Sequence, residues 1–356
     1  MENHALGPFT LHVVSGTVPP MSIQPASATQ FFFQLTPEKV LEAVESLGVR
    51  CTGRVLALNS LENRVYEVEL DIDLEPDAGR WDAYRVIKFY RPGRWTREQI
   101  QEEHQFLKEC AAVEIPVVVP LDFPNGGTLG EVGDTGILYA IFPKVGGRIL
   151  DEMSDSELMQ IGRLLARLHN VGASGAFRHR IKLTTDTYGH ANLAYLKENK
   201  LVPASVEGHY LGIAERIIRA SEPWFKETRS QRIHGDCHIG NILWHGKGCY
   251  IVDFDDSLEG PCVQDLWLLT PGRDETAQNQ RRLILEGYEM MRSFDHGSMR
   301  LIEPLRALRM IHFTTWIAKR YEDPAFKQIF VDYGSERYWR EQLIALQEVG
   351  ESIGVG

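Results

Sequence analysis

The chain has 356 residues, of which 43% are hydrophobic and 24% are charged. These proportions are typical of a globular protein, and the length is too great for one ordinary hydrophobic core and suits two lobes. The net charge of −11 argues against nucleic acid as the main partner, because binding to a phosphate backbone requires a basic surface.

The cysteines and the start of the chain indicate a compartment. The five cysteines are odd in number and scattered without a CxxC pair, so neither a disulfide framework nor a zinc site is indicated. The first basic residue is Lys39, whereas a signal or transit peptide needs a positively charged start. No apolar run approaches the length of a membrane span. We expect a cytoplasmic protein without membrane association, and we expect a monomer.

A segment without periodicity precedes the first predicted element. Residues 1–30 are rich in Pro, Ser, Gly and Ala, which predicts a disordered extension, and Met21 is a second candidate for the native start. Thr36 offers an N-cap directly before Pro37. This pair predicts a helix that ends at Gly48.

Three strands are predicted next. Residues 55–70 are typical of two strands joined by a turn at 59–63, and residues 84–90 of a third strand. Lys88 stands alone within this apolar third strand, and a buried ammonium group is costly unless an acid pairs with it. The acid is expected on the following helix, which Thr96 can cap.

That helix offers two candidates, Glu102 and Glu103. They point in directions about a hundred degrees apart, so only one of them is expected to meet Lys88.

The remaining regular elements follow from apolar patterns. Further strands are predicted at 117–121 and 136–142. Apolar residues from 158 to 168 repeat at helical spacing and predict a core helix. Amphipathic helices are expected at 283–291 and 301–317.

The most informative stretch is RIHGDCHIGNILWHGKGCYIVDFDD, residues 232–256. Asp236 and Asn241 lie five positions apart in its first polar cluster, and Asp253 follows a predicted hairpin of two apolar strands. Phosphoryl transfer needs one Asp to accept the proton of the attacking hydroxyl, and an Asn and a second Asp to hold Mg²⁺. The spacing matches the catalytic loop of protein kinases. We therefore predict Asp236 and Asp253 as catalytic residues, with Asn241 and Asp253 as metal ligands.

This stretch resembles the catalytic loop of the aminoglycoside phosphotransferase and choline kinase superfamily. Within it, seven ordered blocks resemble the stress response kinase A (YihE/RdoA) family: ENRVYEV, VIKFYRPGRWT, EEHQFL, VGGR, HGDCHIGNILW, GPCVQDLW and IEPLRALR. The resemblance implies an α+β, bilobal protein-kinase-like fold. A nucleotide-binding, β-rich N-lobe is expected at 31–145, and a larger, mainly helical C-lobe for catalysis and substrate binding at 146–356.

The resemblance also implies roles in binding ATP. Lys88, paired with Glu103, would fix the phosphates. Backbone N–H groups near Ser60 would cover them, although the turn has no GxGxxG. Backbone groups at Phe142 to Val145 would meet adenine, and Asp265 would brace the catalytic loop.

For the activity, the resemblance implies an ATP- and Mg²⁺-dependent serine/threonine protein kinase of the stress response that phosphorylates itself. A small-molecule kinase for an aminoglycoside, choline or homoserine type of alcohol is the alternative. A pseudokinase scaffold is disfavoured, because Lys88, Asp236, Asn241 and Asp253 are all present.

Only eleven residues separate Asp253 from Asp265, too few for a long activation loop. A protein substrate would then be held by the C-lobe, at 173–231 or after 273. A basic cluster there could meet an acidic partner; its members are Arg178, Arg180 and Lys182.

Overall fold

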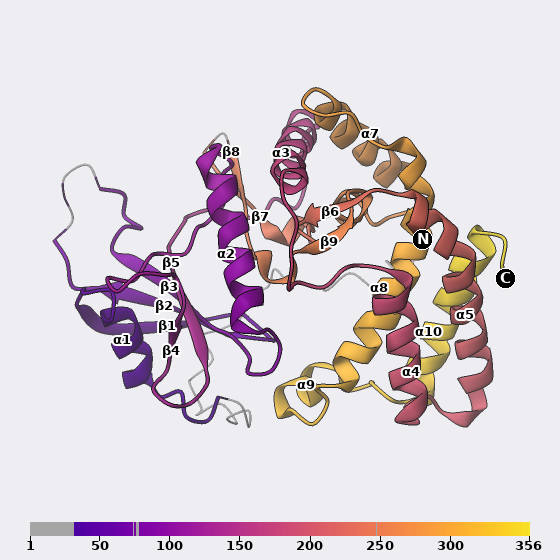
Figure 1. Cartoon of the computed structure of the whole chain (residues 1–356), viewed down its shortest axis with the longest axis horizontal. Coiled ribbons are helices and arrows are strands. Elements are labelled where there is room, and N and C mark those ends of the chain that lie inside the picture. The colour runs from indigo at the N-terminus through magenta and orange to yellow at the C-terminus, as the bar shows by residue number, and fades with distance from the viewer. Residues whose placement is uncertain (1–31, 74, 76–77, 247) are drawn as a thin grey trace, which may run out of the picture.

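The computed structural model describes residues 32–356 except 74, 76–77 and 247. The extension predicted at 1–30 therefore lies outside the described residues. A small lobe built around one β-sheet lies beside a larger lobe made mainly of helices, and α2 stands between them (Figure 1). This is the α+β, bilobal arrangement of protein kinases that the sequence predicts.

The small lobe is a five-stranded antiparallel sheet with two helices. The strand order is β1-β2-β3-β5-β4. Thr36 caps the first helix with Pro37 in its first turn, and Thr96 forms a capping box with Gln99 at the start of the second. The elements are α1 (Pro37–Glu45), β1 (Cys51–Leu58), β2 (Arg64–Leu70), β3 (Tyr84–Phe89), α2 (Arg97–Ala112), β4 (Gly130–Glu131) and β5 (Leu138–Pro143).

Successive side chains of β3 face opposite sides of the sheet, and this alternation determines where Lys88 points. Ile87 and Phe89 are fully buried in the core that α1 covers. Lys88 lies between them in sequence and therefore faces the other side of the sheet, where it is paired in register with Ala140 of β5. Ala140 packs with Ile100 of α2. The lysine thus points toward α2 and the larger lobe.

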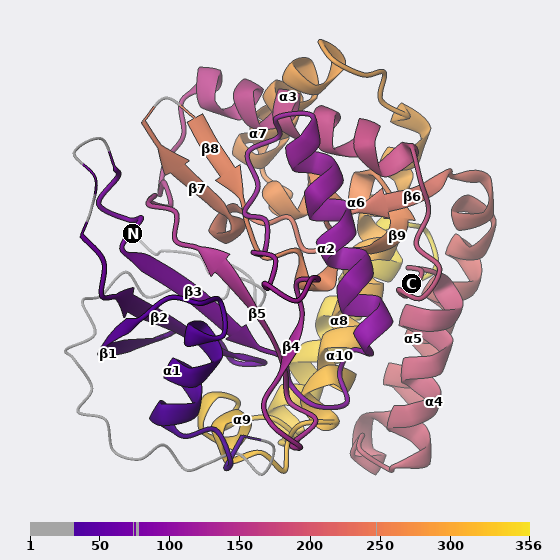
Figure 2. The ribbon, with the colours of Figure 1, turned by 60° about the vertical axis from the view of Figure 1, so that its left-hand side comes forward.

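The larger lobe is mainly helical, with two short two-stranded sheets, β6-β9 and β7-β8. Figure 2 shows α8 and α10 behind β5 and α2. The helices are α3 (Asp155–Ala173), α4 (Ala191–Glu198), α5 (Ala204–Glu227), α6 (Val263–Leu269), α7 (Glu275–Glu289), α8 (Ile302–Ala318), α9 (Pro324–Ile329) and α10 (Glu336–Ser352); the strands are β6 (Ser230–Ile233), β7 (Ile242–His245), β8 (Gly248–Ile251) and β9 (Leu258–Pro261). The predicted core helix and hairpin are confirmed as α3 and β7-β8.

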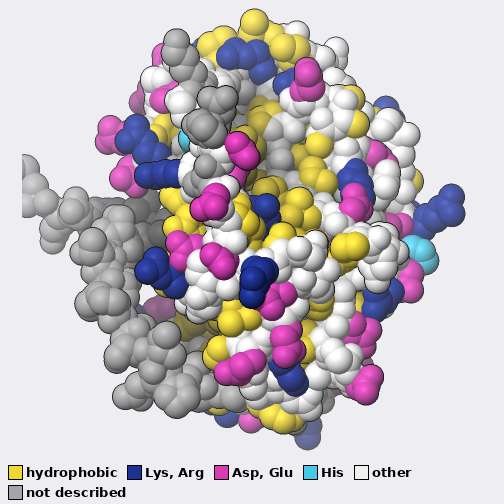
Figure 3. All heavy atoms as spheres, turned by 90° about the vertical axis from the view of Figure 1, so that its left-hand side faces the viewer, with side chains coloured by type: hydrophobic (Ala, Val, Ile, Leu, Met, Phe, Trp, Pro, Cys, Tyr) yellow, Lys and Arg dark blue, Asp and Glu magenta, His cyan; other side chains and the backbone are white. Residues whose placement is uncertain are grey.

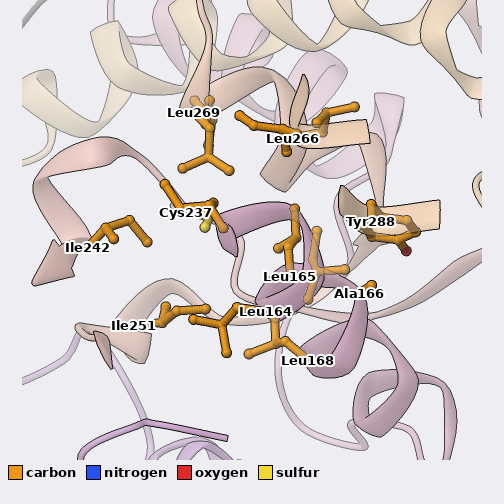
Figure 4. Close-up of a cluster of buried hydrophobic side chains, with 14 of the residues drawn as sticks. Leu164, Leu165, Ala166, Leu168, Cys237, Ile242, Ile251, Leu266, Leu269 and Tyr288 are labelled. Carbon is orange, nitrogen blue, oxygen red and sulfur yellow. The ribbon is translucent and has the colours of Figure 1, made fainter. Parts of the chain in front are cut away.

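An apolar cluster of the larger lobe supports the polar loop between β6 and β7. Cys237 is fully buried there, among leucines of α3 and Ile242 and Ile251 of the hairpin (Figure 4). Since Cys237 directly follows Asp236, burying its side chain fixes the backbone that carries the carboxylate.

The strand predicted at 117–121 is wrong. Val117 makes a single parallel bridge to Ile251, and no described residue of this range belongs to a named strand. Val117 packs in the core of the larger lobe, whereas Leu121 packs against the sheet of the small lobe. The apolar run crosses between two cores, so it cannot pair with one sheet along its length.

The surface of the small lobe carries charges of both signs. On the described part of the face in Figure 3, acidic and basic side chains are interspersed rather than gathered into one basic patch. Within the described ranges, no helix has the length and apolar character needed to cross a bilayer.

Candidate active site

The loop after β6 is anchored by a buried aspartate of α6. Asp265 is fully buried and accepts the backbone N–H groups of His234, at 2.9 Å, and Gly235, at 2.8 Å. It also lies 3.1 Å from Nε2 of buried His169. Gly235 has φ +83°, and a Cβ there would lie 2.3 Å from the carbonyl oxygen of Asp256, so only glycine fits.

We expect Asp265→Asn to lower the free energy of unfolding by about 2–4 kcal/mol, because an amide cannot accept all of these buried donors. Chemical denaturation would measure the loss. The control is Asp274→Ala, which removes the N-cap of α7 and should cost only about 1 kcal/mol. Equal losses in the two variants would contradict the bracing role of Asp265.

The predicted proton acceptor is held between two basic groups. Arg309 Nη2 of α8 donates to Asp236 Oδ1 at 2.8 Å, and His238 Nε2 lies 3.6 Å from Asp236 Oδ2. Burial favours the neutral carboxyl, but Arg309 and then His238 outweigh it and lower the pKa of Asp236. The carboxylate is therefore ionised at neutral pH. Asn241 Nδ2 donates to the Asp236 carbonyl oxygen at 3.0 Å, which brings these two predicted residues together.

Asp253, at the exit of β8, has left-handed backbone geometry, with φ 61° and ψ 65°. This conformation costs a non-glycine residue about 1–2 kcal/mol and is concentrated at functional sites. The side chain of Asp253 is 59% exposed, and its Oδ1 lies 3.4 Å from Lys88 Nζ. The turn therefore presents a solvent-accessible carboxylate beside the lysine of β3.

The predicted pairing of Lys88 with Glu103 is not the one that the structure shows. Lys88 Nζ forms its shorter ion pair with Asp255 Oδ1, at 2.9 Å. Burial alone would lower the pKa of Lys88, but Asp255 and Asp253 raise it well above its usual value. Glu103 is buried and lies 3.5 Å from Arg180. Glu102 accepts backbone N–H groups of residues 178–180 instead.

Glu103 is nevertheless close enough to Lys88 to affect its charge. Burial raises the pKa of Glu103 to about 7, against the opposing effect of Lys88. Spacing along the sequence points to an acid on α2, but the shorter contact of Lys88 comes from residue 255, which lies on a separate segment.

Two further residues hold Asp255 in place. Arg94 donates to Asp255 at 2.5 Å and to Asp256 at 2.6 Å, and Asn63 Nδ2 donates to Asp255 at 3.2 Å. Burial would raise the pKa of Asp255, but Arg94 and Lys88 lower it. Charge and spacing in the sequence do not reveal these contacts, although Arg94 stands in RPGRWT and Asn63 in ENRVYEV, two of the blocks that carry the resemblance.

The turn between β1 and β2, which contains Ser60, is tied to the larger lobe. Ser60 Oγ accepts the backbone N–H of Asn63 at 3.3 Å. Buried Glu62 pairs with Arg320, just beyond α8, at 2.8 Å. The turn thereby covers the cleft that contains Asp236 and Asp253.

The segment predicted to bind adenine is not among the residues that line this cleft. Phe142 pairs in register with Val86 at the end of β5, and Val145 follows two residues beyond the strand. Lys144, between them, pairs with Glu67 and lies 4.4 Å from the Trp81 ring centroid. Contact of this segment with adenine stays a prediction.

The three residues of the predicted basic cluster do not form one exposed surface for an acidic partner, because one of them is buried. Arg180 is buried and donates to the carbonyl oxygens of Asp255 and Ser257. Only Arg178 and Lys182 are exposed. The interior position of Arg180 follows from the close packing of its loop against α2, which the spacing of charges cannot reveal.

Asp236 and Asp253 open into a cleft of about 740 Å³ between the lobes. The β1-β2 turn, the segment after β3, the loops carrying Asp236 and Asp253, and one face of α8 form its walls. Its charged lining residues are Glu62, Arg91, Arg94, Asp236, Asp253, Asp255, Asp256, Arg309, Lys319 and Arg320.

The chemistry of the donors suits a hard divalent cation. The described residues contain no group of three or more His, Cys, Asp or Glu side chains that could hold a metal ion by themselves. Mg²⁺ at nucleotide sites needs only one or two protein oxygen ligands, because phosphates and water supply the rest. Asp253 offers carboxylate oxygens. Asn241 uses its Nδ2 within the loop, which leaves its amide oxygen for a ligand.

The chain is similar to known proteins both in sequence and in fold. Residues 55–302 match the phosphotransferase enzyme family. Stress response kinase A of Salmonella paratyphi A and that of Escherichia coli K12 are each 38% identical to this chain over 314 residues, covering 88% of it and 92% of the relative. A protein of Salmonella typhimurium with the same identity and coverage is named serine/threonine protein kinase RdoA.

Solved structures share the fold at low sequence identity. The amicoumacin kinase hAmiN, in complex with AMP-PNP, Ca²⁺ and Ami, has a TM-score of 0.68 at 17% identity and covers 88% of this chain and 93% of its own. A microcompartment-associated aminopropanol kinase has a TM-score of 0.67 at 16% identity and covers 90% and 99%. With the family match and the 38% identity, the chain belongs to the phosphotransferase enzyme family, among the relatives named stress response kinase A.

Proposed function

We propose that this protein is a serine/threonine protein kinase of the stress response that transfers the γ-phosphoryl group of ATP with Mg²⁺ and also phosphorylates itself. The observation that carries the proposal is that Asp236 and Asp253 line one cleft, while Asn241 donates to the Asp236 carbonyl oxygen and Lys88, far away in sequence, lies 3.4 Å from Asp253. In the reaction, a bond forms between the acceptor oxygen and the γ-phosphorus. The bond from that phosphorus to the β,γ-bridging oxygen breaks, and ADP leaves with its electron pair.

Asp236 accepts the proton of the acceptor hydroxyl. Its lowered pKa keeps it ionised and ready as a base, while its hydrogen bond with Arg309 fixes its orientation. The transition state of phosphoryl transfer is loose, so most of the remaining work is positioning. Burial of Cys237 and the bonds of Asp265 supply that rigidity to the loop.

Asn241 and Asp253 would hold Mg²⁺. Bound there, the ion would offset the negative charge of the phosphates. Lys88 would contact the phosphates from the small lobe, and backbone N–H groups near Ser60 would cover them. The nucleotide itself would lie against the segment from Phe142 to Val145.

The protein acceptor is supported by the name of a relative with 38% identity, serine/threonine protein kinase RdoA. We expect the purified protein, incubated with labelled ATP and Mg²⁺, to label itself and a generic protein substrate. Phosphoamino-acid analysis should show phosphoserine or phosphothreonine. Label found only in small molecules, with none on protein, would overturn this assignment.

A small-molecule alcohol is the second candidate acceptor. The structures with the same fold include kinases named for amicoumacin and aminopropanol, and the cleft of about 740 Å³ has the volume of a small-molecule site. The same labelling experiment, with the small-molecule fraction of a cell extract added, separates the two candidates.

A further inference from the structure

Two stacked rings, those of Tyr188 and His312, form part of the cleft wall near Asp236. Their centroids lie 4.3 Å apart with 24° between the planes, and both residues line the cleft. Tyr188 belongs to the helical segment Thr185–His190. His312 lies on α8 one turn beyond Arg309, whose guanidinium donates to Asp236. Burial raises the pKa of Tyr188, and nearby Asp236 adds to this effect. The stacked pair therefore stands beside the proposed base.

The hydrogen bonds of Asn192 determine which nitrogen of His312 carries the proton. Asn192 is buried, and its Nδ2 donates to the carbonyl oxygens of Thr187, at 3.3 Å, and Tyr188, at 2.8 Å. Because both of these partners can only accept, the amide nitrogen and not the amide oxygen must face them. The same Nδ2 lies 3.3 Å from His312 Nδ1, so this ring nitrogen accepts. A neutral imidazole with an unprotonated Nδ1 carries its proton on Nε2.

The Nε2–H group of His312 is accessible from the cleft. Among the described residues it has no hydrogen-bond partner, and it is not one of their buried side-chain atoms that lack a partner. Burial lowers the pKa of His312 to about 4 against the opposing effect of Asp256, and Arg309 adds to the decrease. The ring is therefore neutral at pH 7. The cleft wall thus presents a neutral donor, held in orientation by Asn192 and Tyr188.

Packing alone does not account for a histidine at this position. A phenylalanine would stack on Tyr188 equally well, and the neighbouring cleft residues Phe313 and Trp316 are themselves aromatic. The histidine adds a hydrogen-bond donor that the described residues leave unused. A donor fixed in an otherwise aromatic wall is typical of a group that orients a ligand.

We propose that His312 binds the acceptor, with its Nε2–H donating a hydrogen bond to an uncharged oxygen atom close to the hydroxyl that meets Asp236. This inference rests on the proposed function and assigns a residue that determines its acceptor specificity. In a protein acceptor, the oxygen is a backbone carbonyl beside the serine or threonine. In a small alcohol, it is a second hydroxyl.

Nitrogen-15 NMR of the full chain, labelled at histidine, tests the orientation of the donor. The shifts of the two ring nitrogens report which of them is protonated, and His312→Phe assigns the signals of this ring by removing them. At pH 7 we expect a proton on Nε2 and none on Nδ1. A proton on Nδ1, whether alone or together with one on Nε2, would overturn the proposal.

His312→Phe also tests the contact with the acceptor, because it keeps a ring against Tyr188 and removes both nitrogens. The acceptors are casein, the inactive Asp236→Asn chain and glycerol. We expect KM for the acceptor to rise about three- to tenfold, as for the loss of one neutral hydrogen bond. The values of kcat, KM for ATP and the slow hydrolysis of ATP by water should stay unchanged. His312→Gln, which restores an N–H group near the position of Nε2, should recover part of the loss.

The matched control is His209→Phe, an exposed histidine of α5 outside the cleft, which should change none of these values. The acceptor that responds to His312→Phe identifies the source of the oxygen, a peptide carbonyl for the two proteins or a second hydroxyl for glycerol. If KM for every phosphorylated acceptor stays at the wild-type value, the proposal fails. An equal fall in phosphoryl transfer and ATP hydrolysis would show a structural role and would also reject it.

Turnover by the wild type separates this outcome from failure of the proposed function. Phosphorylation that is insensitive to His312→Phe rejects the contact with the acceptor and leaves the kinase assignment standing. If the wild type labels neither of the two proteins nor glycerol, the kinase assignment is rejected, and the acceptor contact that rests on it is rejected too.

Discussion

Asp236→Asn is expected to abolish phosphoryl transfer while the fold and the affinity for MgATP stay close to those of the wild type. The amide keeps the shape of the carboxylate and can still accept the hydrogen bond from Arg309, but it cannot take the proton of the acceptor. Loss of a general base typically costs a factor of about 10²–10⁴ in rate. Label transfer from ATP would measure the rate, and calorimetry the affinity for nucleotide.

The matched control for Asp236→Asn is Asp186→Asn, an exposed carboxylate outside the cleft. It should leave rate and nucleotide affinity unchanged. Denaturation of both variants is needed, because Asp236 also lies within ion-pair distance of His238. Turnover at the wild-type rate in a folded Asp236→Asn protein would remove Asp236 from its role.

The sequence predicts those parts of the site that depend on local spacing. Asp236 and Asn241 share one loop, and Asp253 ends the hairpin that follows it, so a short stretch of sequence places all three. The structure brings the same three residues together. The predicted role of Asp236 as base is tested by Asp236→Asn, and that of Asp253 as metal ligand by Asp253→Ala.

Contacts between distant segments could not be predicted in this way. Arg309 lies 73 residues from Asp236, yet the two are in direct contact. The spacing on α2 offered Lys88 a glutamate, but Asp255 lies closer to its ammonium group. Amphipathic spacing identified α8 as a helix and not which of its polar residues faces the cleft. Such pairings depend on how the lobes pack, and that information is not local in sequence.

Asp253→Ala is expected to weaken MgATP binding by about tenfold or more, because it removes a proposed metal ligand and leaves the phosphate charge less neutralised. Calorimetric titration with ATP, with and without Mg²⁺, would measure the effect. The loss should appear with Mg²⁺ present and be small without it, since Lys88 still pairs with Asp255. Equal affinities of the variant and the wild type for MgATP would contradict the ligand role.

The left-handed backbone at Asp253 supplies a control for that experiment. Alanine at φ 61° would be strained by about 1–2 kcal/mol, whereas glycine adopts this conformation without strain. Asp253→Gly should therefore be the more stable of the two variants in chemical denaturation, yet lose as much affinity for MgATP as Asp253→Ala. If affinity instead follows stability, so that glycine restores nucleotide binding, the alanine effect comes from backbone strain and the carboxylate is not the metal ligand. If both variants lose affinity for MgATP to the same extent, the effect is due to the loss of the carboxylate itself.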